Sequence, residues 1–178
     1  MKVRRVVTGL DEQGRSCVVQ DGPAPRTHDF VHIPGFSNTV VWALADNSAP
    51  AASPQDITTA LSSLMPSDGA SALTIVQFPP VGTMETVDGA QAAEEQAREL
   101  PGLAETFDPR RPGFHTTQTI DYQIVLSGEL WLGLESGEET LVRQGDVVIQ
   151  NRTSHAWTNR AQQPAILAAV SIGVRADN

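Results

Sequence analysis

Cysteine, positive charge and long hydrophobic runs are all scarce in this sequence. The 178 residues include one cysteine, Cys17, which excludes an intramolecular disulfide and is typical of a reducing cytoplasm. Twelve basic residues stand against 21 acidic ones, and the net charge of −9 argues against nucleic acid or an anionic membrane as a partner. No stretch approaches the roughly 18 apolar residues of a membrane span, and the N-terminus lacks a signal-peptide core. We therefore expect a cytoplasmic protein.

Three common catalytic signatures are also missing. The sequence contains no glycine-rich phosphate loop ending in Gly-Lys, no Gly-x-Ser-x-Gly nucleophile elbow and no His-Glu-x-x-His metal motif. His28 and His32 lie in a segment rich in Gly and Pro, with no carboxylate at a spacing typical of a ligand set. We expect these two histidines to be structural or surface residues.

Short segments of strand-forming residues alternate with turn residues along much of the chain. The predicted strands of the first half are residues 2–8, 16–20, 38–44 and 72–78. From Gly113 onward, strands follow one another at short intervals, separated by turns such as Ser127-Gly128 and Gly145-Asp146. Many short strands of this kind, without an internal repeat, predict one all-β sandwich or barrel.

One helix is predicted between these strands, over about residues 88–100. Asp88 can cap it, Gln91 can complete a capping box, and Pro101-Gly102 stops it. The helix body is rich in Ala and Glu, and we expect its acidic side chains to face solvent.

Five polar residues share one parity in the segment that runs from residue 115 to residue 128. They are His115, Thr117, Thr119, Asp121 and Gln123. Side chains alternate between the two faces of a strand, so all five point the same way, either into water or into a polar pocket. The opposite parity is apolar, and we expect it to be buried; it consists of Ile120, Tyr122, Ile124 and Leu126.

A second segment, from Gly145 to Asn159, repeats a polar and aromatic pattern at its end. His155, Trp157 and Asn159 share one parity there. Trp157 is therefore expected to project into the same cavity as His155 and to form part of its wall, with a place in the ordinary core as the alternative.

The two segments together resemble the paired motifs of the cupin superfamily. In the first motif, His115 and Gly128 match the usual histidine and closing glycine. Thr117 stands where a second histidine is usual, and Asp121 stands in place of a glutamate. The resemblance covers about residues 113–172.

The second motif matches at three positions and departs at two. Gly145, His155 and Asn159 correspond to the usual glycine, histidine and asparagine. Gln150 and Arg152 occupy the positions of the usual proline and second glycine.

The resemblance implies a single cupin domain over residues 1–178. Its fold would be a jelly-roll barrel, also called a double-stranded β-helix, with a β extension at the N-terminus and one helical insertion. The strands of the extension would lie within 1–44, the insertion at about 88–100 and the barrel motifs within 113–172.

The resemblance also implies that His115, Asp121 and His155 meet inside the barrel as catalytic residues. The same three would be ligands of a divalent transition metal such as Fe, Zn, Mn or Ni, which imidazole and carboxylate suit. The alternative is a metal-free pocket in which a histidine beside a carboxylate acts as general acid or base. The expected substrate-binding residues are Thr117, Thr119, Gln123, Trp157 and Asn159.

The function expected from this resemblance is that of a small-molecule enzyme. The substrate would be organic, of an aromatic or polyketide-like kind, and the chemistry that of an oxygenase, an isomerase or cyclase, or a lyase. A non-catalytic cupin that binds a small ligand is the alternative, because a fold does not specify a function.

A homodimer is expected as well. Both the apolar face that begins at Ile120 and the valine-rich N-terminal hairpin need cover, and packing two barrels together through the N-terminal strands would supply it. The alternative is a monomer whose hairpin folds back on its own barrel.

Overall fold

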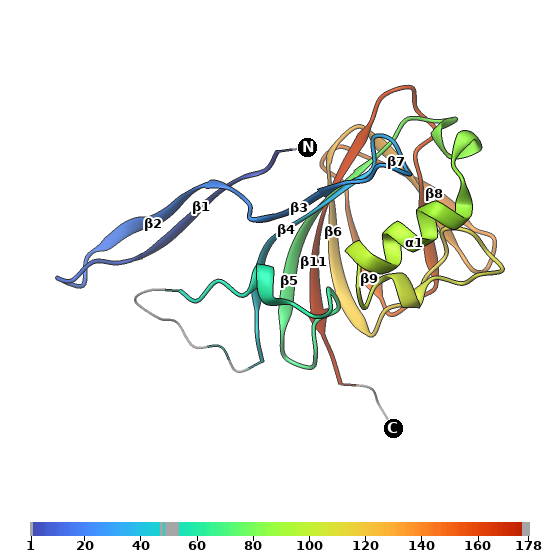
Figure 1. Ribbon diagram of the computed structural model, residues 1–178. Helices are drawn as coiled ribbons and strands as arrows, with labels where there is room; N and C mark the ends of the chain where they lie inside the picture. The colour runs from blue at the N-terminus through green and yellow to red at the C-terminus, as the bar shows by residue number, and fades with distance from the viewer. Residues whose placement is uncertain (1, 47, 49–53, 176–178) are drawn as a thin grey trace.

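The computed structural model describes residues 2–46, 48 and 54–175, whose strands form three antiparallel sheets (Figure 1). A six-stranded sheet has the order β3-β4-β5-β11-β6-β9, a three-stranded sheet the order β10-β7-β8, and β1 and β2 form a separate hairpin. The strands are β1 Arg4–Leu10, β2 Ser16–Pro23, β3 Arg26–Asp29, β4 Ser37–Leu44, β5 Ser71–Phe78, β6 Thr119–Ser127, β7 Glu129–Leu134, β8 Glu139–Arg143, β9 Val147–Asn151, β10 His155–Thr158 and β11 Ala165–Gly173. This arrangement confirms the expected all-β barrel with an N-terminal β extension and one helical insertion.

The two larger sheets enclose an apolar cluster at one end of the barrel. Val125 from β6, Leu130 from β7 and Leu167 from β11 are among its buried members, and Trp157 from β10 packs against the cluster. The closing glycine of the first motif lies beside this cluster. Gly128 has φ +75°, and a Cβ there would come within 3.0 Å of the Ala165 backbone, so both conformation and space require glycine.

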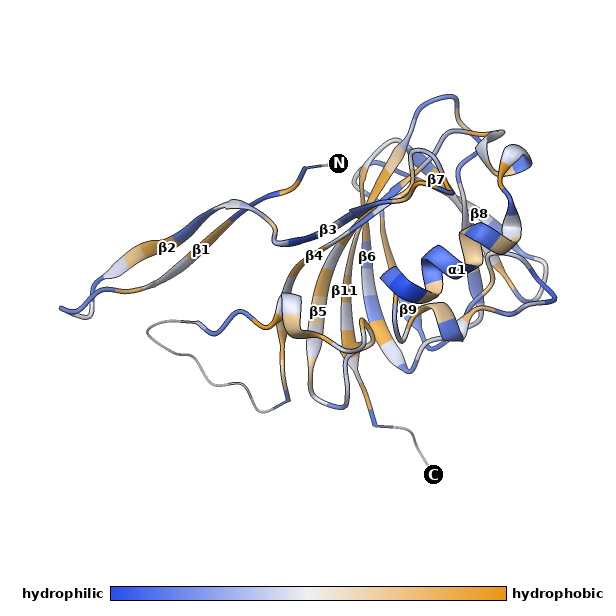
Figure 2. Cartoon of the chain, in the orientation of Figure 1, coloured by the Kyte–Doolittle hydropathy of each residue, from blue (hydrophilic) through white to orange (hydrophobic). Residues whose placement is uncertain are grey.

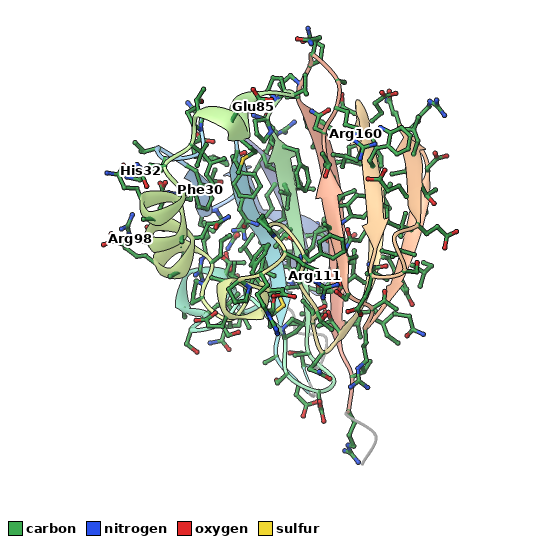
Figure 3. All side chains as sticks on the ribbon, turned by 90° about the vertical axis from the view of Figure 1, so that its right-hand side faces the viewer. Phe30, His32, Glu85, Arg98, Arg111 and Arg160 are labelled. Carbon is green, nitrogen blue, oxygen red and sulfur yellow. The ribbon has the colours of Figure 1, made fainter. Side chains whose placement is uncertain are left out.

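Helix α1, Gly89–Glu99, covers the inner face of the large sheet where the small sheet does not (Figures 1 and 3). Asp88 caps it, accepting hydrogen bonds from the backbone N–H groups of Ala90 and Gln91, as the sequence predicts. Leu100, at the end of the helix, packs with Phe30 beneath it. The described part of the chain also contains the 3₁₀ helices η1 Thr58–Ala60, η2 Thr83–Thr86 and η3 Ala104–Thr106. Among the described residues, no helix is long and apolar enough to cross a membrane.

The prediction that the acidic side chains of α1 face solvent is wrong at Glu95, which is 2% exposed. Its carboxylate accepts hydrogen bonds from the backbone N–H groups of Val31 (2.9 Å) and His32 (2.8 Å), and its Oε1 lies 2.8 Å from His28 Nε2. Burial raises the pKa of Glu95, but the hydrogen bonds outweigh it and lower the pKa to about 2. Glu95 therefore ties α1 to the loop after β3, and His28 has a structural role.

We expect Glu95→Gln to lower the free energy of unfolding by about 1–3 kcal/mol at pH 7, because an amide cannot accept all three hydrogen bonds. The depressed folded pKa means that the carboxylate stabilises the fold above pH 4.5 and that this stabilisation is lost as the pH falls towards about 2. The difference between wild type and variant, measured by urea unfolding, should therefore shrink over that window. Glu94→Gln, on the exposed side of α1, is the control and should change little.

The apolar face of β6 lies in a different place from the one that we expected. The polar side chains on one face of β6 are buried inside the barrel. The apolar side chains on the other face lie on the outside of the large sheet, where Tyr122 is 44% and Leu126 43% exposed. The prediction that this apolar face is buried is therefore wrong for the single chain. The reason is that α1 and the small sheet both pack on the inner face, which leaves the outer one uncovered.

Candidate functional site

Strand β6 carries a row of buried polar side chains into the barrel interior. Asp121 and Gln123 follow Thr119 on the inward parity, and all three are buried. Thr117, just before the strand, is buried too, and the Thr119 hydroxyl donates a 2.7 Å hydrogen bond to the Thr117 hydroxyl. The two threonines thus satisfy each other, and they position the start of the strand.

The two motif histidines lie side by side. His115 and His155 form a backbone pair, with N–H to O distances of 3.0 and 3.1 Å, and their ring centroids are 4.3 Å apart. The ring of Phe107 packs on His115 at a centroid distance of 4.8 Å. Forty residues of sequence separate the two imidazoles, and the ladder between their backbones brings them into contact.

Hydrogen bonds to backbone carbonyls orient both imidazoles. His155 Nδ1 lies 2.9 Å from the Thr153 carbonyl, and His115 Nδ1 lies 3.3 Å from the Gly113 carbonyl. A carbonyl can only accept, so the proton sits on Nδ1 of each neutral ring and Nε2 carries the lone pair. The Nε2 atoms are therefore the basic atoms of the site.

Burial keeps these imidazoles uncharged. It lowers the pKa of His155 to about 4, with a further contribution from neighbouring His115. Burial also lowers the pKa of His115, opposed by the hydrogen bond to Gly113 and by the charge of Asp121. Both rings are neutral at pH 7 and can accept a proton at Nε2.

Strand β9 adds a residue that we did not predict as part of the site. Gln150 pairs with Asp121 in the β6-β9 ladder and is buried, and cross-strand partners share one face of a sheet. On the other side of Asp121, Ser171 of β11 is its partner and is also buried. The sequence does contain one indication that Gln150 belongs to the site, because Gln150 puts a polar side chain in the position of the motif proline. Arg152, in the position of the motif glycine, has the φ of +56° that glycine would favour.

Five buried polar atoms in this interior have no hydrogen-bond partner within the described part of the chain. They are Asp121 Oδ1, Gln123 Oε1, Gln150 Nε2, His155 Nε2 and Trp157 Nε1. An unpaired buried polar atom costs about 1–3 kcal/mol, so a group of them in one place is typical of a site that binds a ligand. We call these five residues together with His115 the barrel site.

Asn159 and Trp157 are the last two of the predicted substrate-binding residues. Asn159 donates from Nδ2 to the Gln163 carbonyl at 2.7 Å and accepts from the Ala161 N–H at 2.9 Å, so its amide stabilises the turn before β11. The ring of Trp157 packs on the apolar cluster and lies 6.3 Å from the His155 ring, edge to face.

The fit to a metal ion is incomplete. Each imidazole has the orientation of a metal ligand, with Nδ1–H bound to a carbonyl and Nε2 free. However, among the described residues no group of three or more His, Cys, Asp and Glu side chains is placed to hold a metal ion. Open catalytic zinc sites use three protein ligands. As placed here, His115, Asp121 and His155 do not make such a set.

Two surface hollows lie away from the barrel site. One, of about 270 Å³, is at the base of the hairpin beside Val3 and Pro23, and the other, of about 210 Å³, is beside His32 and Glu95. Neither is bordered by a residue of the barrel site, whose polar side chains are enclosed between the two sheets.

Curated relatives match a short part of the chain. Phomopsin biosynthesis cluster protein C' of Diaporthe leptostromiformis is 47% identical over 55 residues, which are 29% of this chain and 29% of that protein. Cupin-domain-containing oxidoreductase srdD of Neurospora crassa is 49% identical over 45 residues, 25% of this chain and 23% of that protein. The matches thus span less than a third of the length of each relative. No family model matches.

Over these 45 residues the chain is similar to proteins named as cupin-domain-containing oxidoreductases. Among solved structures, a cupin-like protein of Thermotoga maritima is 10% identical, with 77% of this chain and 68% of that chain covered and a TM-score of 0.42. A sugar phosphate isomerase of the cupin superfamily from Silicibacter pomeroyi is 14% identical, with coverages of 79% and 61% and a TM-score of 0.42. Similarity at this level does not bear on function.

Proposed function

We propose that the protein is an enzyme that transforms an organic small molecule by acid–base chemistry at the barrel site. The observation that carries this proposal is the state of His155, a fully buried, neutral imidazole whose Nε2 is unpaired. A base of this kind, beside a second imidazole and near a carboxylate, is the usual equipment for moving a proton.

The barrel site also contains donors suited to a developing negative charge. Gln150 Nε2 and Trp157 Nε1 are N–H donors without a partner in the described chain. In the reaction we propose, His155 Nε2 takes a proton from a carbon next to a substrate carbonyl; the electron pair of the broken C–H bond forms a C=C bond, and the π pair of the carbonyl moves to its oxygen. Hydrogen bonds from the two donors stabilise that oxyanion. Returning the proton to another atom completes an isomerisation, and loss of a leaving group completes an elimination. In a cyclisation, the enolate carbon attacks a second carbonyl of the same molecule and the proton returns to the new alkoxide oxygen.

The names of the relatives support a small-molecule substrate. They include phomopsin and oryzines biosynthesis cluster proteins and cupin-domain oxidoreductases, although the matches are short. We propose an aromatic or polyketide-like carbonyl compound, whose rings would pack against Trp157. The cytoplasmic location and the absence of a nucleic-acid partner stay predictions.

Proton exchange tests this proposal without knowledge of the natural product. Aromatic and polyketide-like ketones would be incubated with the protein in D₂O, and exchange of the C–H next to the carbonyl would be followed by NMR. We expect the wild type to catalyse exchange of at least one compound, His155→Ala to lose it, and His32→Ala to retain it. Binding without exchange or oxygen uptake would favour the non-catalytic alternative, and oxygen uptake an oxygenase.

A metal centre at His115, Asp121 and His155 stays an alternative proposal, and it requires these side chains to come closer together than the structure places them. Thr117→His would restore the usual second histidine of the motif, and we expect it to tighten binding of Zn²⁺ on the order of 10-fold or more, as a further ligand should. Titration calorimetry and elemental analysis measure this. His155→Ala should abolish stoichiometric binding, and unchanged stoichiometry in that variant would contradict the assignment.

We also propose that the protein acts as a homodimer. The two uncovered apolar surfaces, on the large sheet and on the hairpin, support this proposal.

A further inference from the structure

We propose that the barrel site binds an uncharged hydroxy carbonyl compound and that Asp121 is the residue that determines this specificity. Asp121 accepts a hydrogen bond from a hydroxyl group close to the substrate carbonyl, and its charge repels a carboxylate or a phosphate group. This inference rests on the proposed function, because it names the class of substrate that the same site takes.

The interior around the barrel site contains a buried negative charge and no buried arginine or lysine. Asp121 is 4% exposed, and the buried side chains of the described residues include neither of the two permanently basic types. The imidazole of His155 is fully buried as well, and burial disfavours the charged form of such a ring. An anionic group that entered this interior would therefore lie beside a carboxylate without a positively charged partner.

Arg111 could become such a partner only by leaving the contacts that it makes. Its guanidinium reaches the hydroxyl of Ser154, the residue before His155, at 3.5 Å. It also pairs with Asp108 at 2.8 Å and with Glu135 at 3.1 Å. Taking a carboxylate or a phosphate out of water without a partner cation is strongly unfavourable. We therefore expect the barrel site to exclude substrates that carry either group.

The unpaired acceptors of the barrel site require a hydrogen-bond donor in the ligand. Asp121 Oδ1 and Gln123 Oε1 have no partner within the described part of the chain. A carboxylate can only accept, so a substrate with a carbonyl group alone would leave Asp121 unpaired. A hydroxyl group donates to Asp121 and can also accept from Gln150 Nε2, the unpaired donor across the ladder, whereas an ammonium group can only donate. A hydroxyl group therefore matches this part of the site.

The pairing of the strands places the hydroxyl group close to the carbonyl. Asp121 and Gln150 are direct cross-strand partners, so their Cβ atoms are about 5 Å apart and the groups that they bind are neighbours in the ligand. On the other side, β11 places two small residues, Ser171 and Ala169, opposite the polar residues of β6. Figure 2 shows hydrophilic residues on β6 beside the mostly hydrophobic β11. The small partners leave room for a ligand at the polar row.

Binding of matched aryl ketones to the full chain tests the hydroxyl group and the charge separately. α-Hydroxyacetophenone carries the hydroxyl group, α-methoxyacetophenone an ether that cannot donate, and benzoylformate a carboxylate. The indole N–H signal of Trp157 in NMR spectra of isotope-labelled protein, assigned with Trp157→Phe, reports binding at the site. We expect the hydroxy ketone to bind on the order of 10-fold or more tighter than the ether, because a hydrogen bond to a carboxylate is lost. Benzoylformate should not shift the signal at the concentration that saturates the hydroxy ketone.

Three variants show which residue causes this selectivity. Asp121→Asn should reduce the preference for the hydroxy ketone over the ether to a few-fold, because a neutral amide accepts a weaker hydrogen bond than a carboxylate, and it should let benzoylformate bind. Asp68→Asn removes a charge at an exposed position and should match wild type. Ala169→Val fills the space opposite Gln123 and should weaken binding of both neutral ketones. Circular dichroism would verify that each variant folds.

The inference is overturned if the wild type binds the ether as tightly as the hydroxy ketone, binds benzoylformate, or does not bind the hydroxy ketone. Unchanged selectivity in Asp121→Asn, or unchanged binding in Ala169→Val, would also overturn it. Selective binding without deuterium exchange would support the inference and contradict the proposed reaction. Exchange of plain acetophenone at the rate of the hydroxy ketone would contradict the inference and leave the proposed reaction in place.

Discussion

Acidification from pH 7 to pH 4.5 is expected to lower the free energy of unfolding of the metal-free protein by about 2–3 kcal/mol through His155 alone. The folded pKa of His155 is about 4, against 6.5 for an ordinary histidine. Below pH 6.5 this histidine takes up a proton in the unfolded chain, whereas the buried ring is protonated at equilibrium only as the pH approaches 4. Stability is therefore full above pH 6.5 and is lost as the pH falls towards 4.

Urea unfolding at closely spaced pH values between 7 and 4.5, with a chelator present, measures this loss. His155→Gln removes the titrating ring and should flatten most of the pH dependence, while His32→Gln, outside the barrel, should leave it in place. The window ends at pH 4.5 because Glu95 begins to lose its contribution below that value. A wild type equally stable at pH 7 and pH 4.5 would mean that the His155 ring is solvated and not enclosed.

Asp121→Asn is expected to reduce turnover on the order of 100-fold, the usual size of an acid–base contribution. The substitution preserves the shape of the side chain but removes a charge that raises the pKa of His115. It also replaces one carboxylate oxygen by an NH₂ group, next to the unpaired Gln150 Nε2 donor across the ladder. Both changes weaken the proton transfer without altering the core.

The deuterium-exchange rate on the compound that wild type accepts provides the measurement, with kcat and KM determined separately. Asp68→Asn removes the same charge at an exposed position and should match wild type in rate. If Asp121→Asn exchanged the substrate proton at the wild-type rate, Asp121 would have a structural role only.

Local sequence was sufficient for most of the strands, but not for β3, Arg26–Asp29, which lies in a segment rich in Gly and Pro. Alternation of polar and apolar residues in 115–126 indicates two opposite faces, and the resemblance to the paired cupin motifs implies that His115 and His155 meet. The helix at about 88–100 was equally predictable, because Asp88 and the flanking glycine and proline act within one turn of the chain. Strand alternation and helix capping depend on residues that are close together in the sequence.

Only the tertiary structure decided which face of β6 is covered and which distant residues complete each site. Gln150 joins Asp121 through a ladder between strands β6 and β9, and Glu95 meets His28 across 67 residues. Alternation along the sequence shows that the two faces of a strand differ. It does not show on which face the helix and the small sheet pack. That choice depends on long-range packing, in which the inner face buries polar side chains and the apolar outer face is left for another surface.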